Sequence, residues 1–74
     1  MSNKQSIGDR IRNKRLSMSL TIAKLSDRTG LATGHLSEIE NGLTVNLQAQ
    51  TLRKLAKGLE MSIVELLGED DTDA

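Results

Sequence analysis

The 74-residue chain contains no cysteine, no proline and no phenylalanine, tyrosine or tryptophan. Without cysteine it forms neither disulfides nor thiolate metal sites, and one histidine makes no ligand cluster, so we expect no cofactor. Without aromatic rings it has no platform on which single-stranded bases stack. No apolar run is long enough to span a membrane, and the N-terminus lacks the apolar core of a signal peptide. These absences favour a soluble cytoplasmic protein.

The formal net charge is zero, but the charges are unevenly distributed along the chain. Residues 1–28 contain seven basic and two acidic residues, a net charge of +5, whereas residues 29–74 contain three basic and eight acidic residues, a net charge of −5. Four of these acids lie within the last seven residues: Glu69, Asp70, Asp71 and Asp73. We therefore expect one small folded domain over residues 1–67 and a disordered acidic tail over residues 68–74.

Apolar residues recur at helical spacing and never alternate with a period of two, which argues against a sheet. The spacing predicts five helices, at residues 7–17, 22–29, 33–41, 49–57 and 63–67. Ser6, Thr21 and Ser62 precede three of these segments as N-caps, while Gly30 and Gly42 follow two of them as stop signals. The expected fold class is therefore all-α, a compact five-helix domain with an aliphatic core.

The helical pattern predicts that a seam of apolar side chains joins the second and third helices, with Gly30 making the turn between them. Ser26 lies beside this seam, where a small side chain lets the two helices approach closely. Leu16 in the first helix and Ala23 in the second are also expected to face the core. The seam consists of Leu25, Leu31, Leu36 and Ile39.

Together these features resemble the lambda-repressor-like, Cro-type (XRE-type) helix-turn-helix family over nearly the whole chain, from Ile7 to Leu67. The matching segments are IGDRIRNKR, LT followed by KLSDRTGL, LSEIENG, TLRKLAKGL and MSIVELL. The S-x-I-E-N-G ending of the third helix is especially typical. The resemblance implies a compact all-α domain that binds double-stranded DNA, usually as a two-fold dimer.

The resemblance also implies roles for individual positions. The third predicted helix is the recognition helix, with base-facing positions at Thr33, Gly34 and Glu38 and with His35 beside them. Positions that contact backbone phosphates lie at the start of the second helix, at the end of the third and in the loop that follows. These phosphate-contacting positions are Thr21, Ala23, Asn41, Thr44 and Asn46.

Several positions depart from the family pattern. Ile22 stands where a glutamine often holds a phosphate, and Ala32 stands where a serine or threonine usually caps the recognition helix. Thr33 is then expected to cap the helix instead of contacting a base. Gly34 has no side chain, and Glu38 accepts from a cytosine amino group at most, so we expect DNA shape to contribute to recognition.

The charged side chains also have simpler interpretations. Arg10, with Arg12 and Lys14, either contacts phosphates or forms a solvated face of the first helix. His35 and Glu38 are either DNA contacts or ordinary solvated helix residues.

Arg15 and Glu40 occupy positions that pair in the family and link the first helix to the end of the third. We expect a partly buried ion pair that holds the recognition helix in place. The alternative is that both charges are exposed and unpaired.

The last predicted helix, at residues 63–67, has more apolar side chains than one short helix can bury. Ile63, Val64, Leu66 and Leu67 lie within five residues, so their side chains point in every direction around the axis. We expect the surplus, Ile63, Val64 and Leu67, to form a homodimer interface.

The favoured function is a small dimeric repressor that binds an inverted-repeat operator in double-stranded DNA and blocks transcription. The alternative is an antitoxin or protein-binding adaptor that has the same fold, which the neutral charge and the missing glutamine favour slightly. An enzyme is not expected, because the sequence offers no nucleophile with a matching base and no paired carboxylates.

Overall fold

The computed structural model describes residues 6–44 and 46–68. Within these ranges the chain forms five helices and no strand, which confirms the all-α prediction. The helices are α1 (Ile7–Ser17), α2 (Ile22–Thr29), α3 (Thr33–Glu40), α4 (Ala49–Gly58) and α5 (Ile63–Leu67). α3 ends one residue earlier than predicted and α4 one residue later. None of the five described helices is long and apolar enough to cross a membrane.

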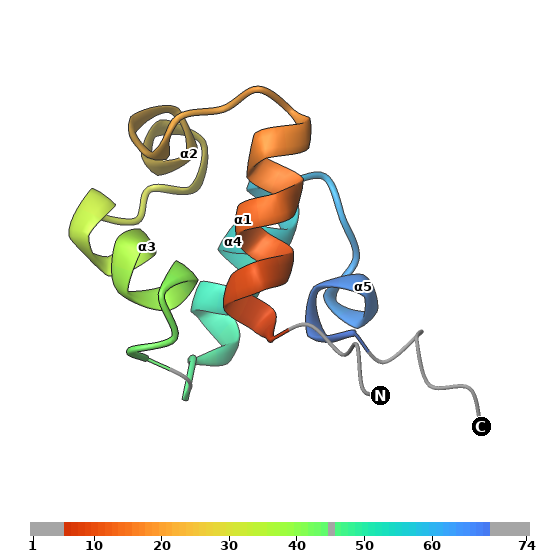
Figure 1. Cartoon of the computed structure of the whole chain (residues 1–74). Coiled ribbons are helices and arrows are strands. Elements are labelled where there is room, and N and C mark those ends of the chain that lie inside the picture. The colour runs from red at the N-terminus through yellow and green to blue at the C-terminus, as the bar shows by residue number, and fades with distance from the viewer. Residues whose placement is uncertain (1–5, 45, 69–74) are drawn as a thin grey trace, which may run out of the picture.

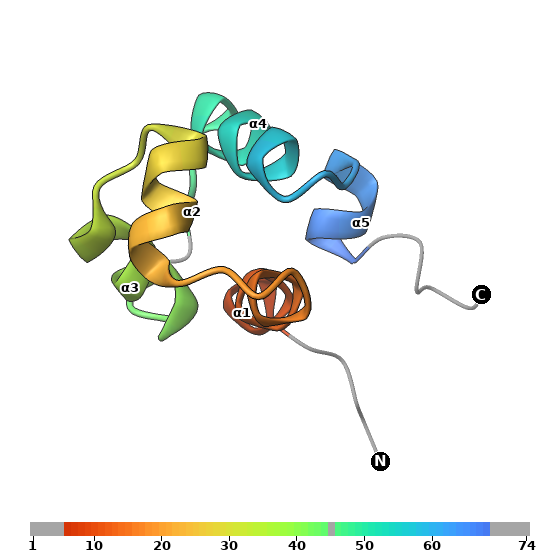
Figure 2. The same cartoon turned by 90° about the horizontal axis from the view of Figure 1, so that it is seen from above.

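The five helices form a closed ring around one core. α1 packs against α3 and α5, α2 packs against α3 and α4, and α4 packs against α5. In Figure 1, α1 lies in front of α4, with α2 and α3 on one side and α5 on the other. Figure 2, the view from above, shows the ring with α4 across from α1. Each helix thus has two neighbours that cover its apolar side.

The core is aliphatic, as the absence of aromatic residues requires, and every helix contributes to it. Burying one such side chain stabilises the folded chain by about 1.5–3 kcal/mol. No single helix holds the majority of the fully buried side chains, so the core forms only when all five helices pack together. The fully buried side chains are Ile11, Leu25, Leu36, Ile39, Leu55, Leu59 and Leu66.

Two residues predicted to face the core are instead exposed. Leu16 is 57% exposed, and Ala23 also lies on the surface. At 100° per residue, Leu16 points about 140° away from the buried Ile11, and Ala23 points about 160° away from the buried Leu25. Both predictions were wrong because an apolar residue inside a helix need not belong to its buried stripe.

Side-chain caps begin three of the helices. Ser6 accepts a hydrogen bond from the Asp9 N–H, and Thr21 accepts one from the Lys24 N–H. Ser62 and Glu65 form a reciprocal capping box at α5, with donor–acceptor distances of 3.0 and 2.8 Å. These three caps were predicted from the sequence.

The cap expected at α3 is absent. Ala32 is the N-cap residue of α3, and no side chain caps this end of the helix. Thr33 is the first helical residue, so the prediction that its hydroxyl caps the helix was wrong. Its side chain is exposed.

The turn between α2 and α3 is fixed by hydrogen bonds as well as by glycine. Gly30 has a left-handed backbone, with φ of 78°, which glycine adopts without strain. The Ser26 hydroxyl donates to the Leu31 carbonyl at 2.6 Å, so Ser26 does more than provide room. The buried Thr29 hydroxyl donates to the Leu25 carbonyl and accepts from the Leu31 N–H. These bonds set the angle between α2 and α3.

α1 approaches the C-terminal end of α3 through Gly8. A Cβ atom at Gly8 would lie within 3 Å of the Ile39 and Glu40 carbonyl oxygens. These acceptors belong to the backbone and cannot rotate away as a flexible side chain can. Gly8 therefore allows the two helices to touch, a role that sequence analysis did not identify.

A buried ion pair joins α1 to α3 beside this contact. Arg15 donates from Nε and Nη2 to the two carboxylate oxygens of Glu40, at 2.7 and 2.9 Å. The two side chains are only 12% and 2% exposed. Arg15 also donates from Nη1 to the Leu20 carbonyl at 2.9 Å, and Arg12 Nε lies 3.5 Å from Glu40. One guanidinium thus connects α1, the segment before α2 and α3.

The hydrogen bond from Arg15 to Glu40 raises the pKa of the Arg15 guanidinium above its ordinary value; burial opposes this effect and the charge of Glu40 adds to it. Because the Arg15 pKa is raised in the folded state, the stability that the ion pair contributes is fully present below the ordinary arginine pKa. This stability is lost only as the pH rises through the raised, folded-state pKa. The Arg15 charge therefore persists throughout the neutral range.

The described chain ends at Gly68, which closes α5 with a left-handed backbone. Residues 69–74, which carry the acidic charges of the predicted tail, lie outside the described residues.

We predict opposite effects of alanine at two helical glycines. Gly8→Ala should lower the free energy of unfolding by about 1–3 kcal/mol, because the new methyl group overlaps carbonyl oxygens of α3. Gly34→Ala should raise it by up to about 1 kcal/mol, because that position faces open space and alanine favours a helix. Urea unfolding followed by circular dichroism measures both. Equal stability of the two variants would contradict the close α1–α3 contact.

We predict that Arg15→Met lowers the free energy of unfolding by roughly 3 kcal/mol, because it leaves the buried Glu40 carboxylate without its main partner. Glu60→Gln is the matched control. It weakens the exposed Arg28–Glu60 pair, in which Glu60 is 69% exposed, and should cost no more than about 1 kcal/mol. Thermal and urea unfolding compare the variants, and similar losses in both would show that burial of the Arg15 pair has no special effect.

Candidate DNA interface

The exposed face of α3 carries the residues predicted to face DNA bases. Thr33 and Gly34 are exposed, and nothing lies within 4 Å of the position of a Cβ at Gly34. The side chains of His35 and Glu38 are 37% and 57% exposed, and His35 Nδ1 lies 3.9 Å from a Glu38 carboxylate oxygen. The structure therefore brings all four predicted base-facing residues to one uncovered helix surface.

The opposite face of α3 is fully anchored. Leu36 and Ile39 have no exposed surface, and Glu40 is held by Arg15. α3 therefore presents one face, with Thr33, Gly34 and Glu38, to solvent, while its other face is fixed in the core.

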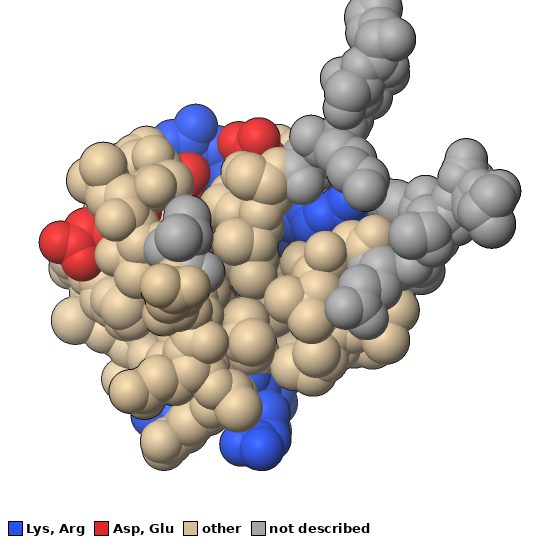
Figure 3. Space-filling view, turned by 90° about the horizontal axis from the view of Figure 1, so that it is seen from below, with Lys and Arg blue, Asp and Glu red and all other residues tan. Residues whose placement is uncertain are grey.

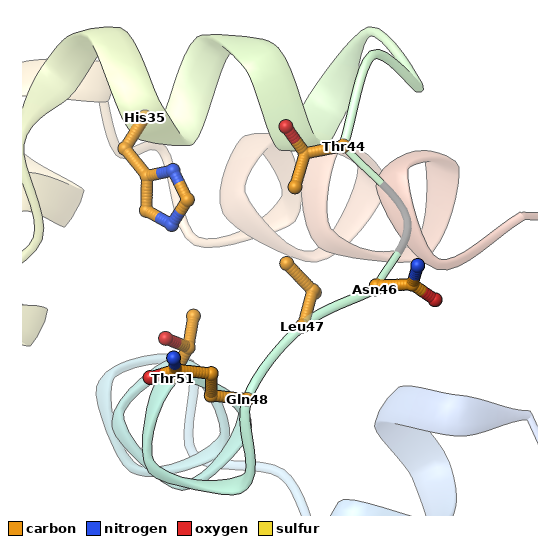
Figure 4. Close-up of a pocket in the computed structure, with 6 residues that line it drawn as sticks. All are labelled: His35, Thr44, Asn46, Leu47, Gln48 and Thr51. Atoms are coloured by element: carbon orange, nitrogen blue, oxygen red, sulfur yellow. The ribbon is translucent and has the colours of Figure 1, made fainter.

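A cavity of about 280 Å³ lies beside the exposed face of α3, between that helix, the following loop and the start of α4. Figure 4 shows the His35 ring projecting from α3 toward α4, with Thr44 on the loop beside it. Two of the predicted phosphate-contacting residues, Thr44 and Asn46, belong to this cavity. Its lining consists of His35, Thr44, Asn46, Leu47, Gln48 and Thr51.

Sequence analysis missed the α4 side of the cavity. Gln48 and Thr51 stand at the N-cap and in the first turn of α4, where the pattern showed only the apolar stripe of that helix. The sequence signal was the absence of Ser, Thr, Asp or Asn at the N-cap, which leaves the first N–H groups of α4 without a side-chain acceptor.

The start of α2, where phosphate contacts are predicted, lies on the surface. Thr21 and Ala23 are exposed, and Thr21 accepts from the Lys24 N–H. Ile22 is partly buried and packs against the core. The isoleucine thus supports packing at a position where the family often has a phosphate-binding glutamine.

Asn41 closes α3 at the other end of this surface. Its Oδ1 accepts from Arg12 Nη2 at 3.2 Å, and its Nδ2 donates to the Ser37 hydroxyl at 3.4 Å. The side chain of Arg12 is 47% exposed, so this arginine supplies a positive charge beside Asn41.

Arg10, the arginine predicted to contact phosphate, does not join these residues. Its guanidinium lies directly against Gly68 at the end of α5, and Arg10 is partly buried. Since α5 and α3 pack on different sides of α1, Arg10 and the exposed face of α3 lie apart. Arg12 takes the place beside α3 because it is two residues further along the helix.

The charge distribution shows no single basic patch on the face that Figure 3 presents. This face includes the loop between α3 and α4, and most of it consists of uncharged residues, with lysine and arginine in separate groups. Several arginines bind other parts of the chain instead. Arg28, for example, donates to the Gly58 carbonyl and to Glu60. The face in Figure 3 therefore carries few charges, acidic as well as basic.

α5 leaves part of its apolar surface uncovered. Val64 and Leu67 are 46% and 41% exposed, whereas Leu66 is fully buried. Ile63 is partly buried and packs against the core, so it belongs more to the core than to the predicted interface. The uncovered surface of α5 is therefore formed by Val64 and Leu67.

Known proteins share this arrangement. The profile of a helix-turn-helix family matches residues 11–66. The chain is 35% identical over 65 residues to the HTH-type transcriptional regulator SinR of Bacillus licheniformis, over 88% of this chain and 59% of that protein. It thus spans less than two thirds of that relative.

Two solved structures are also similar. The crystal structure of SinR in complex with DNA gives a TM-score of 0.79 at 34% identity, over 82% of this chain and 97% of that one. The P22 c2 repressor in complex with a synthetic operator gives a TM-score of 0.79 at 30% identity, over 86% of this chain and 96% of that one. With its five-helix fold and the exposed face of α3, the chain belongs to the lambda-repressor-like, XRE-type helix-turn-helix family.

Proposed function

We propose that this chain is a transcriptional regulator that binds double-stranded DNA and acts as a small repressor, and not as an enzyme. The observation that carries the proposal is the exposed face of α3, which is presented by a helix whose other face is buried and ion-paired. The solved relatives include SinR and the P22 c2 repressor, each in complex with DNA. Binding at a promoter would block polymerase sterically.

In this proposal α3 enters the major groove with its exposed face. Glu38 accepts a hydrogen bond from a cytosine amino group, and Thr33 contacts a thymine methyl group or a base edge. Gly34 contributes no side chain, so much of the sequence preference comes from DNA shape.

Polar groups on both sides of α3 hold the DNA backbone. Thr21 and Ala23 lie at the start of α2, where free N–H groups and the helix dipole attract a phosphate. Asn41, Thr44 and Asn46 lie at the other end, with Arg12 beside Asn41. Contacts on both flanks fix the register of α3 in the groove.

Two copies of the chain associate through Val64 and Leu67 in this proposal. These side chains form an apolar surface that a second copy can cover. A two-fold dimer places its recognition helices about 34 Å apart, so the operator is an inverted repeat. The folded domain of residues 1–67 is sufficient for this binding, and the acidic tail is separate from it.

We predict that selection from a random pool of DNA duplexes yields an inverted-repeat sequence. The affinity for it should fall steeply with salt, with a slope of about 0.9 per neutralised phosphate in a log–log plot. Fluorescence anisotropy at several salt concentrations measures this slope. Failure to enrich any duplex would favour the alternative of a protein-binding module.

We predict that Asn46→Asp weakens DNA binding roughly tenfold or more, because it places a negative charge beside a backbone phosphate. Lys57→Gln is the matched control. It lowers the net charge by the same one unit in the last turn of α4, at the far end of the helix from Gln48. Equal losses in both variants would show that net charge alone, and no local contact, sets the affinity.

We predict that Val64→Glu produces monomers and weakens binding to the full inverted repeat. Leu16→Glu, at an apolar residue that is 57% exposed on α1, should change neither. Sedimentation equilibrium at micromolar concentration and binding to full and half operators distinguish the variants. A wild-type chain that is already monomeric on DNA would contradict the interface.

A further inference from the structure

The apolar surface of α5 is too small to hold a stable dimer by itself. Val64 and Leu67 are 46% and 41% exposed, so each side chain offers less than half of its area. A stable interface usually covers about 800 Å² on each partner and involves about 20–30 residues a side. A dimer that pairs through α5 therefore needs further contacts from the residues around this surface.

Basic residues of α1 border the apolar surface of α5. The Arg10 guanidinium lies directly against Gly68, which follows Leu67 at the end of α5. Lys14 lies four residues further along α1, about 40° around the helix from Arg10, so the two side chains share one stripe. Lys14 is partly exposed, and its ammonium group has no ion-pair partner within the described part of the chain. Arg10 and Lys14 form what we call the basic stripe of α1.

The acidic charges of the chain begin at the same point. Residues 69–73 follow Gly68 directly and contain four acidic residues and no basic one. Five extended residues span up to about 17 Å, whereas Arg10 and Lys14 are only about 6 Å apart along the helix axis. The acidic segment is therefore long enough to cross a dimer contact and to follow the basic stripe.

We propose that residues 69–73 of one copy lie along the basic stripe of α1 in a second copy, so that charge pairs reinforce the apolar contact of α5. The inference rests on the dimer in the proposed function, and it names the surface and the segment that complete that dimer. The segment leaves α5 at the rim of the apolar surface, so it emerges beside the second copy when that surface is covered. A two-fold contact is self-complementary, so the same pairing forms twice.

The pairing also keeps the acidic charges away from bound DNA. α1 lies between α3 and α5 (Figure 2), so the basic stripe and the exposed face of α3 are on different sides of α1. The acidic segment thus strengthens the dimer without contacting DNA. Because the charges are on the surface, the dimer should weaken as salt screens them.

A charge exchange tests whether the pairing joins two copies. One full-length variant carries Asp70→Lys and Asp71→Lys, which leave its acidic segment without net charge. The other carries Lys14→Glu, which leaves its basic stripe without net charge. Either homodimer loses both pairings, whereas a mixed dimer keeps one, between the unaltered stripe of the first variant and the unaltered segment of the second.

Native mass spectrometry of an equal mixture measures the dimer populations. The association constant of the mixed dimer should exceed the geometric mean of the two homodimer constants by roughly tenfold, the effect of two or three exposed ion pairs. If each acidic segment pairs with the stripe of its own copy, neither variant keeps a pairing and the mixed dimer has no preference.

Lys24→Glu is the matched control for Lys14→Glu. It makes the same change in net charge at an exposed residue of α2, a helix that packs against α3 and α4. This variant keeps both its segment and its stripe. Its mixture with the first variant should therefore show no preference for the mixed dimer over the mean of the homodimers.

The outcomes separate this inference from the proposed function. If the wild-type chain is a dimer but the exchange gives no preference, the inference is wrong while the dimeric regulator stands. An equal preference with Lys24→Glu would also overturn it, because net charge alone would then drive pairing. If the wild-type chain is monomeric at micromolar concentration and on its operator, the proposed dimer and this pairing are both wrong. Circular dichroism checks that each variant is folded.

Discussion

The placement of α3 depends on the contact that its C-terminal end makes with α1. Gly8 lets the two backbones touch, and Arg15 binds both oxygens of Glu40, whose side chain is 2% exposed. Because Arg15 also binds the Leu20 carbonyl, the same side chain fixes the segment that leads into α2. The contact of α3 with α1 thus depends on a charge pair and a missing methyl group, while the aliphatic core supplies most of the stability.

Exposure and anchoring are divided between the two faces of α3. One face holds Leu36, Ile39 and Glu40, all almost inaccessible to water, and the other holds Thr33, Gly34 and Glu38, all exposed. The proposed phosphate contacts lie on the loop and helix start that flank this exposed face. Rigid support behind an uncovered surface is the arrangement that lets a protein place a few side chains accurately in a groove.

Local signals in the sequence predicted the five helices well, because Ser6, Thr21 and Ser62 cap helices and Gly30 makes the turn by local chemistry. The roles of Gly8 and of the Thr29 hydroxyl depend on neighbours distant in the fold, so local patterns could not reveal them. The α4 side of the cavity was missed for the same reason. Arg12, and not Arg10, lies beside Asn41, because two residues along a helix turn a side chain by about 200°.

Gly34 has empty space around it, and its neighbour Thr33 is equally uncovered. Neither position contributes to the core, so side chains there can be exchanged without disturbing the buried face of α3. Recognition can therefore diverge by single substitutions that leave the core intact. A lineage built on this scaffold is free to acquire new binding preferences in small steps, each of them tolerated by the fold.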